Sequence, residues 1–163
     1  MPIASILKIP VVPHGMIRLL SGELSYITRR IDRDDSKGKI PMEDFCQISE
    51  RLTEDKYKGS VERVGKLLRK YSIFPGLDIT DLFARVLFNF LIVNSDVHLK
   101  NYSLIETPQG MRLSPAYDLL STAIVIPEDP EESALTINGK KSKITTTDFD
   151  SLAQYLVYKG MSL

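Results

Sequence analysis

Residues 79–101 read ITDLFARVLFNFLIVNSDVHLKN, a long apolar run that passes directly into a polar one. The apolar side chains recur at the three- and four-residue spacing of one helical face. This spacing predicts a helix from about Ile79 to Val93, with Asp78 or Thr80 as its N-cap. A helix that is apolar nearly all round is buried, so we expect it at the centre of the core. The apolar positions are Leu82, Phe83, Val86, Leu87, Phe88, Phe90, Leu91 and Ile92.

A polar loop and a hairpin follow this helix. The loop contains Asp96, His98 and Asn101. Two short strand-like runs come next, joined by a Thr-Pro-Gln-Gly turn signal and ending at Leu113. A second acid, Asp118, lies just beyond them. The predicted order is therefore buried helix, polar loop, hairpin and acid.

Turn signals dominate the first 40 residues. Proline disfavours helix at and before its own position, so residues 1–13, with three prolines, are expected to form an extended lead-in. Runs 16–20 and 23–29 flank a Ser-Gly turn signal and predict a β-hairpin. Residues 32–40 are expected to be a polar loop.

Three further helices are predicted. Pro41 can open the first, whose apolar stripe ends at Leu52. Ser60 can cap the second, which has apolar residues at helical spacing over 61–68. The last is expected from about Thr146 to Leu156. Together with the hairpins, these helices predict an α+β fold that is mostly helical.

Composition and charge narrow the function classes. The 163 residues predict one domain. Twenty-one basic and 21 acidic residues give a net charge of zero, so we expect no direct nucleic-acid binding. No apolar run approaches the roughly 20 residues of a membrane span, and the amino terminus lacks signal-peptide features. The single Cys46 fits a reducing compartment. The chain is therefore expected to be cytoplasmic, with no membrane partner.

The polar loop and the second acid carry the chemistry. Asp96 precedes Asn101 by five positions, the spacing found in the catalytic loop of protein kinases, where a metal-binding Asp lies beyond the next hairpin. Asp118 has that position. Magnesium prefers carboxylate and amide oxygens, which Asp118 and Asn101 would supply. Asp96 would accept or orient the proton of an attacking hydroxyl.

Other interpretations of the same residues stay open. Asp96 and Asn101 could satisfy backbone groups of a turn, while Asp118 caps a helix. A metal-dependent phosphohydrolase using Asp96, His98 and Asp118 is a weaker alternative, and it predicts phosphatase turnover without ATP. His98 is otherwise expected to be a hydrogen-bonded strut.

A family resemblance adds to these observations. Residues 88–104, FNFLIVNSDVHLKNYSL, look like the catalytic segment of HipA-type serine/threonine kinases, the toxins of toxin–antitoxin pairs. Residues 113–121, LSPAYDLLS, look like the metal-binding segment of that family. Residues 26–33 resemble the hinge between the two lobes, and residues 43–47 and 134–156 are also similar to the family.

The resemblance implies a role for each matching position. Asp96 would be the catalytic base, and Asn101 and Asp118 would ligate magnesium. The backbone of the hinge would contact the adenine of ATP, and Tyr117 lies next to the metal site. The nucleotide-binding set that follows is Arg29, Arg30, Ile31, His98, Leu99, Lys100, Asn101, Tyr117 and Asp118.

The resemblance also implies a division into lobes. Residues 1–31 would be a remnant of the amino-terminal lobe, consisting of the β-hairpin and the hinge. Residues 32–163 would be an incomplete carboxy-terminal kinase domain. A two-lobed kinase needs on the order of 250 residues, more than a usual domain of about 100–150. In the family, the phosphate-binding loop and its lysine should precede the hairpin. We therefore expect a truncated form, inactive by itself.

Two functions are consistent with these features. The first is the catalytic core of an ATP- and Mg-dependent kinase that phosphorylates serine or threonine on a protein when the missing lobe completes it. The second is an inactive kinase relic that binds a partner or a nucleotide. The family implies a protein substrate, for which glutamyl-tRNA synthetase is the precedent, and a HipB-like antitoxin. A partner chain bearing the amino-terminal lobe, or a dimer, would cover the surface where that lobe docks.

Overall fold

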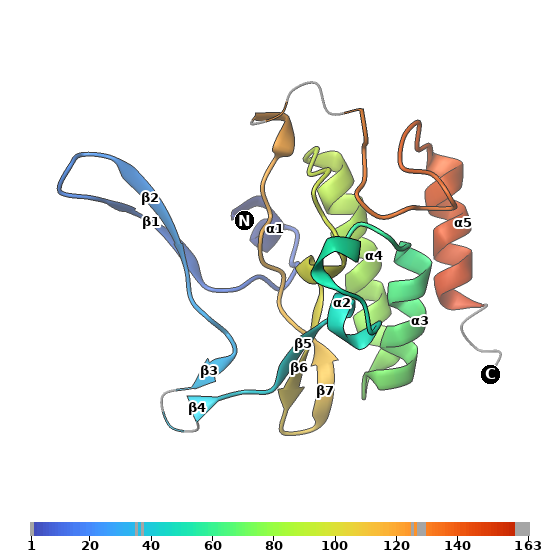
Figure 1. Ribbon diagram of the computed structural model, residues 1–163, viewed down its shortest axis with the longest axis horizontal. Helices are drawn as coiled ribbons and strands as arrows, with labels where there is room; N and C mark the ends of the chain where they lie inside the picture. Colours follow the sequence, from blue (N-terminus) through green and yellow to red (C-terminus); the bar gives the residue numbers. More distant parts are fainter. Residues whose placement is uncertain (1, 35, 37, 125, 127–129, 159–163) are drawn as a thin grey trace.

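A computed structural model describes residues 2–34, 36, 38–124, 126 and 130–158. It confirms the α+β fold, with a helical body and small antiparallel sheets (Figure 1). The elements in chain order are α1 (Pro2–Ile6), β1 (His14–Arg18), β2 (Leu24–Thr28), β3 (Arg33–Asp34), β4 (Gly38–Lys39), β5 (Met42–Asp44), α2 (Phe45–Ile48), η1 (Thr53–Asp55), α3 (Val61–Tyr71), α4 (Pro75–Leu91), η2 (Leu99–Asn101), β6 (Ser103–Thr107), β7 (Gly110–Leu113), η3 (Thr122–Ile124) and α5 (Thr146–Val157).

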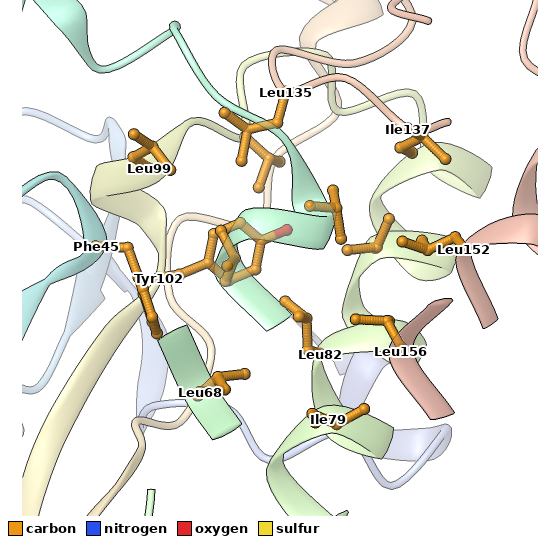
Figure 2. Packing of buried hydrophobic residues seen from close by; sticks show 14 of the residues in the cluster. Phe45, Leu68, Ile79, Leu82, Leu99, Tyr102, Leu135, Ile137, Leu152 and Leu156 are labelled. Carbon is orange, nitrogen blue, oxygen red and sulfur yellow. The ribbon is translucent and has the colours of Figure 1, made fainter. Parts of the chain in front are cut away.

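The helical body is built from α3, α4 and α5. Helix α3 packs against both of the others, and it begins where the sequence predicts, because the Ser60 hydroxyl accepts a hydrogen bond from the Arg63 amide at 3.2 Å. The predicted last helix is confirmed as α5. Apolar side chains from these helices and from the sheet meet in one core (Figure 2). Its fully buried members include Phe45, Val61, Val64, Leu68, Leu82, Leu99, Leu152 and Leu156.

Helix α4 lies in the core but begins earlier than predicted. It starts at Pro75, which needs no backbone N–H donor at the first helical position. The expected cap Asp78 is instead a fully buried acid inside the helix, paired with Arg112 at 2.6 Å. The helix is not buried all round either, because Leu91 at its end is 67% exposed.

A three-stranded antiparallel sheet, ordered β5-β6-β7, stands beside the helices. The predicted hairpin is confirmed as β6 and β7, with Leu104 opposite Leu113. The prediction of a helix that opens at Pro41 is wrong, because the chain continues there as strand β5, with Met42 paired to Ile105. Helix α2 begins only after Asp44, whose carboxylate accepts the Gln47 amide at 2.8 Å.

The predicted amino-terminal hairpin is confirmed as β1 and β2. Gly22 takes a φ of 90° in its turn, a conformation that glycine adopts without steric cost. The hairpin extends away from the helical body (Figure 1), and large apolar side chains on it are exposed. These are Met16, Ile17, Leu24, Tyr26 and Ile27, with Leu19 and Leu20 in the turn region.

Two expectations for the first 40 residues are wrong. Residues 2–6 form α1 rather than an extended lead-in, because Pro2 occupies the first helical position, where its ring is tolerated. Ala4 packs with Phe88 of α4 and with Ala116, so this helix is held by the body. The segment expected as a polar loop contains the short pair β3 and β4. The division of the chain at residue 31 stays a prediction.

Candidate functional site

Asp96 lies in a loop whose path is set at the end of α4. Val93 has a left-handed φ of 55°, which is strained for a β-branched residue. The Val93 carbonyl accepts hydrogen bonds from the backbone amide and the hydroxyl of Thr122, both at 2.9 Å. The same hydroxyl accepts the Ser95 amide at 3.0 Å. Thr122 therefore holds the chain on the amino-terminal side of Asp96, whose own side chain is exposed.

Asn101 and Asp118 meet across the loop. The Asn101 side chain donates from Nδ2 to Oδ2 of Asp118 at 2.8 Å. Its Oδ1 accepts the His98 amide at 2.9 Å, which fixes the orientation of the side-chain amide. Asp118 also has a left-handed φ, 58°, and its carbonyl accepts a hydrogen bond from Asn94 Nδ2 at 3.3 Å. Backbone strain of this kind is concentrated at functional sites.

His98 and Leu99 face the interior rather than solvent. His98 is 7% exposed, and burial, together with the positive charge of Lys56, lowers the pKa of its imidazole. The Leu99 side chain is fully buried in the core. These two residues of the predicted nucleotide-binding set therefore anchor the loop to the body.

Tyr117 links the loop to the segment that bears Asp118. Its hydroxyl donates to the Lys100 carbonyl at 2.9 Å and shares a hydrogen bond of 2.5 Å with the Ser103 hydroxyl. Burial raises the pKa of this phenol to about 12. The neutral hydroxyl is therefore a fixed strut between the two segments, one residue before Asp118.

A pocket of about 400 Å³ lies next to this strut. It brings the predicted hinge residues Arg29, Arg30 and Ile31 together with Lys100 and Tyr117. Arg30 is held in place there by Asp32, to which it donates two hydrogen bonds, at 2.9 and 2.6 Å. These bonds lower the pKa of the Asp32 carboxyl to about 2. The remaining lining residues are Val12, Thr28, Asp32, Met42, Asp44, Gln47 and Ser103. The other five predicted residues, Asp96, His98, Leu99, Asn101 and Asp118, do not line it.

The residue types of the donor set fit magnesium. Asp118 has a carboxylate and Asn101 an amide oxygen, both of the hard type that this ion takes. In this structure Asn101 turns Nδ2 rather than Oδ1 toward Asp118, so ligation by both residues would require the Asn101 amide to turn over. Among the described residues there is no cluster of three or more histidine, cysteine or acidic side chains placed to hold a metal. Two protein ligands suit magnesium bound together with phosphates and water, which is how nucleotide sites hold it. The same set would not make a structural zinc site.

Three residues that contact the site were not among its predicted residues: Tyr57, Asn94 and Thr122. Tyr57 donates a hydrogen bond from its hydroxyl to Oδ1 of Asp96 at 2.8 Å, across 39 residues of sequence. No local signal marks it. Asn94 lies within the recognised segment 88–104 and Thr122 directly follows segment 113–121, but only the contacts described above reveal what these two residues hold.

Comparisons with known proteins show the family and the fold of this chain. Residues 1–160 match the HipA-like C-terminal domain family. A putative kinase of Sinorhizobium fredii, Y4mE, is 32% identical over 154 residues, which are 90% of this chain and 36% of that protein. A second one, Y4dM, is 38% identical over 147 residues, covering 87% of this chain and 34% of its own length. This chain therefore belongs to the HipA-like C-terminal domain family.

Two further matches involve Shewanella oneidensis. Its serine/threonine-protein kinase toxin HipA is 51% identical over 41 residues, 25% of this chain and 10% of that protein. A structure of the HipA, HipB and operator DNA complex matches with a TM-score of 0.82 and 24% identity, covering 99% of this chain and 44% of that one. This likeness establishes the fold. The chain spans about a third of the length of the two Sinorhizobium kinases.

In the described part of the chain, no helix is long and apolar enough to cross a bilayer.

Proposed function

We propose that this chain is the catalytic-core segment of a HipA-like serine/threonine kinase. Completed by an amino-terminal lobe, it would transfer the terminal phosphoryl group of ATP to a serine or threonine of a protein, in the presence of magnesium. The observation that carries the proposal is the hydrogen bond between Asn101 and Asp118. It joins the two candidate metal ligands beside the loop that presents Asp96.

The residues have separable tasks in this reaction. Asp118 and Asn101 would hold Mg²⁺, which would neutralise charge on the phosphates. Asp96 is exposed, so the hydroxyl of a protein substrate can reach it. Its carboxylate would orient that hydroxyl and accept its proton. Catalysis of phosphoryl transfer is mostly positioning and charge stabilisation, which explains why so many contacts serve to hold these three side chains.

The 400 Å³ pocket supports a nucleoside site at the hinge. Its volume lies within the usual range of small-molecule sites, about 300–1,000 Å³. The backbone of Arg29 to Ile31 would contact the adenine there, and Lys100 and Tyr117 also line the pocket. The phosphates would then extend toward Asn101 and Asp118.

Partners are part of the proposal. The exposed apolar side chains of the β1–β2 hairpin support docking of an amino-terminal lobe, either in the same protein or in a partner chain. The structural match to a HipA–HipB complex supports a HipB-like antitoxin as a second partner. The substrate would be a protein with an accessible serine or threonine, as in the family precedent glutamyl-tRNA synthetase, and the reaction would take place in the cytoplasm.

The test is phosphorylation by the complete protein. We expect transfer of ³²P from labelled ATP with Mg²⁺ to serine- and threonine-containing peptides, and a loss of about 100-fold or more in Asp96→Asn. Asp150→Asn, an exposed acid on α5, is the matched control and should retain the activity. Undiminished transfer by Asp96→Asn would contradict the assignment. Binding of ATP without any transfer would favour the inactive relic.

A further inference from the structure

Tyr57 contacts Asp96 from outside the catalytic loop. Its phenol hydroxyl donates to Oδ1 of the carboxylate at 2.8 Å. The ring is 41% exposed, so this hydrogen bond lies at the surface where a substrate would approach. A hydrogen bond to an ionised carboxylate is shorter and stronger than one between neutral groups.

The phenol is itself held in place. Its ring meets the buried His98 ring edge to face, with centroids 5.1 Å apart, a favourable arrangement for two aromatic rings. The Lys56 ammonium lies 4.8 Å from the centroid of the Tyr57 ring, at a distance where the face of an aromatic ring attracts a cation. Two side chains therefore restrict how the Tyr57 ring can rotate.

The backbone around Tyr57 is tied to the same loop. The Leu99 amide donates to the Lys56 carbonyl at 3.1 Å. Gly59 lies so close to Leu99 that an added Cβ would be 3.3 Å from its Cδ2. Segment 56–59 and the catalytic loop are therefore one packed unit, although they are far apart in the sequence.

We infer that Tyr57 is a positioning residue for Asp96, an inference that rests on the proposed kinase function. Its hydroxyl binds Oδ1 and so turns Oδ2 toward the hydroxyl that is to be phosphorylated. Without it, the exposed carboxylate rotates freely about its side-chain torsions, and fewer encounters have an oxygen aligned with the acceptor proton. Tyr57 acts through Asp96 and does not line the 400 Å³ pocket.

The test replaces the hydroxyl and retains the ring. Tyr57→Phe should lower kcat for peptide phosphorylation by about tenfold, the contribution of one hydrogen bond to a charged group, while KM for ATP stays within twofold. Tyr71→Phe is the matched control, because Tyr71 is 42% exposed and has Lys70 4.8 Å over its ring, but lies at the end of α3. It should leave kcat unchanged.

A double-mutant comparison separates positioning from a general structural role. In an Asp96→Asn background, Tyr57→Phe should cause no further loss, because the group that it positions is gone. An unchanged or raised kcat in Tyr57→Phe would overturn the inference. An equal loss of kcat from Tyr57→Phe in the unmodified protein and in Asp96→Asn would also overturn it, as would a change of both KM and the unfolding midpoint in Tyr57→Phe. Absence of transfer by the unmodified protein, or full transfer by Asp96→Asn alone, would instead refute the proposed kinase function.

Discussion

Asn101 and Asp118 are joined by a hydrogen bond of 2.8 Å from Nδ2 to Oδ2, although they lie 17 positions apart in the chain. The β6–β7 hairpin accounts for this closeness. Strand β6 leaves the loop at Ser103, β7 returns at Leu113, and the antiparallel register places Leu113 opposite Leu104. A short connection through Tyr117 then brings Asp118 back beside the loop, with its carboxylate turned toward Asn101.

Removing either candidate metal ligand should weaken magnesium-dependent nucleotide binding. We expect Asp118→Asn or Asn101→Ala to reduce the affinity of the complete protein for ATP in the presence of Mg²⁺ by at least about tenfold. Calorimetric titration with and without Mg²⁺ measures this. Glu106→Gln, an exposed acid on β6, is the control and should bind normally. Equal weakening in the absence of Mg²⁺ would argue against a metal role.

Thr122 should stabilise the loop that precedes Asp96. Thr122→Val keeps the branched shape but leaves the buried Ser95 amide without its acceptor, which costs about 1–3 kcal/mol of unfolding free energy. Urea denaturation is the measurement. Thr80→Val, which loses a hydrogen bond to Gly76 on an exposed helical surface, should change stability by less than about 0.5 kcal/mol. Similar changes of unfolding free energy in the two variants would contradict a role of Thr122 in stabilising this loop.

Two glycines should respond in opposite ways to alanine. A Cβ at Gly65 of α3 would overlap Cδ2 of Leu156 on α5, so Gly65→Ala should cost about 1–2 kcal/mol in spite of its better helix propensity. Gly76 has open space around it on α4, and Gly76→Ala should stabilise by up to about 1 kcal/mol. Thermal unfolding of both variants checks the pair. A stabilised Gly65→Ala would show that α5 moves away from α3 at little cost.

Acid should destabilise the fold through Asp148 on α5. Its carboxylate accepts hydrogen bonds from Asn138, Lys140 and Thr145, and these hold its pKa well below the ordinary 3.8. Since the folded state releases this proton more readily than the unfolded state, the carboxylate contributes stability above about pH 4. That stability is lost as the pH falls toward the lowered pKa.

The variant Asp148→Asn isolates this carboxylate. It should lower the unfolding free energy at pH 7 and flatten its decline between about pH 4 and pH 2. Urea unfolding at a series of pH values provides the comparison, with Asp150→Asn as a control for loss of one exposed acid on the same helix. An Asp148→Asn variant with the acid dependence of the unmodified protein would contradict this account.

Local signals predicted much of the fold. Ser60 marked the start of α3, a Ser-Gly turn marked the β1–β2 hairpin, and apolar spacing marked α5. Each of these depends on residues close together in the chain. The failures involve distant partners. Met42 is a strand residue because β5 pairs with β6 some 60 positions later, and strand preference follows such neighbours more than the residue itself.

The role of the Asp78 side chain also depends on a residue that is distant in the sequence. An acid just before an apolar helical run has the pattern of an N-cap, and the sequence favours that role. The structure places it inside α4, where it pairs with Arg112, which is 34 residues away. Burial of an unpaired carboxylate would be prohibitive. Arg112, together with hydrogen bonds from the Ser72 hydroxyl and the Leu113 amide, allows this acid to be internal.

By itself, the sequence determined the local features: the helical spacing of α4, the five-residue interval between Asp96 and Asn101, and the turn after β6. Helices and tight turns depend on neighbouring residues, so the chain order contains them. The sequence also predicted that Asn101 and Asp118 share one metal site. Only the tertiary structure decided that these two side chains are hydrogen-bonded to each other and that Tyr57 meets Asp96. Such pairs depend on strand register and on packing between elements far apart in the chain, which no local pattern of residues specifies.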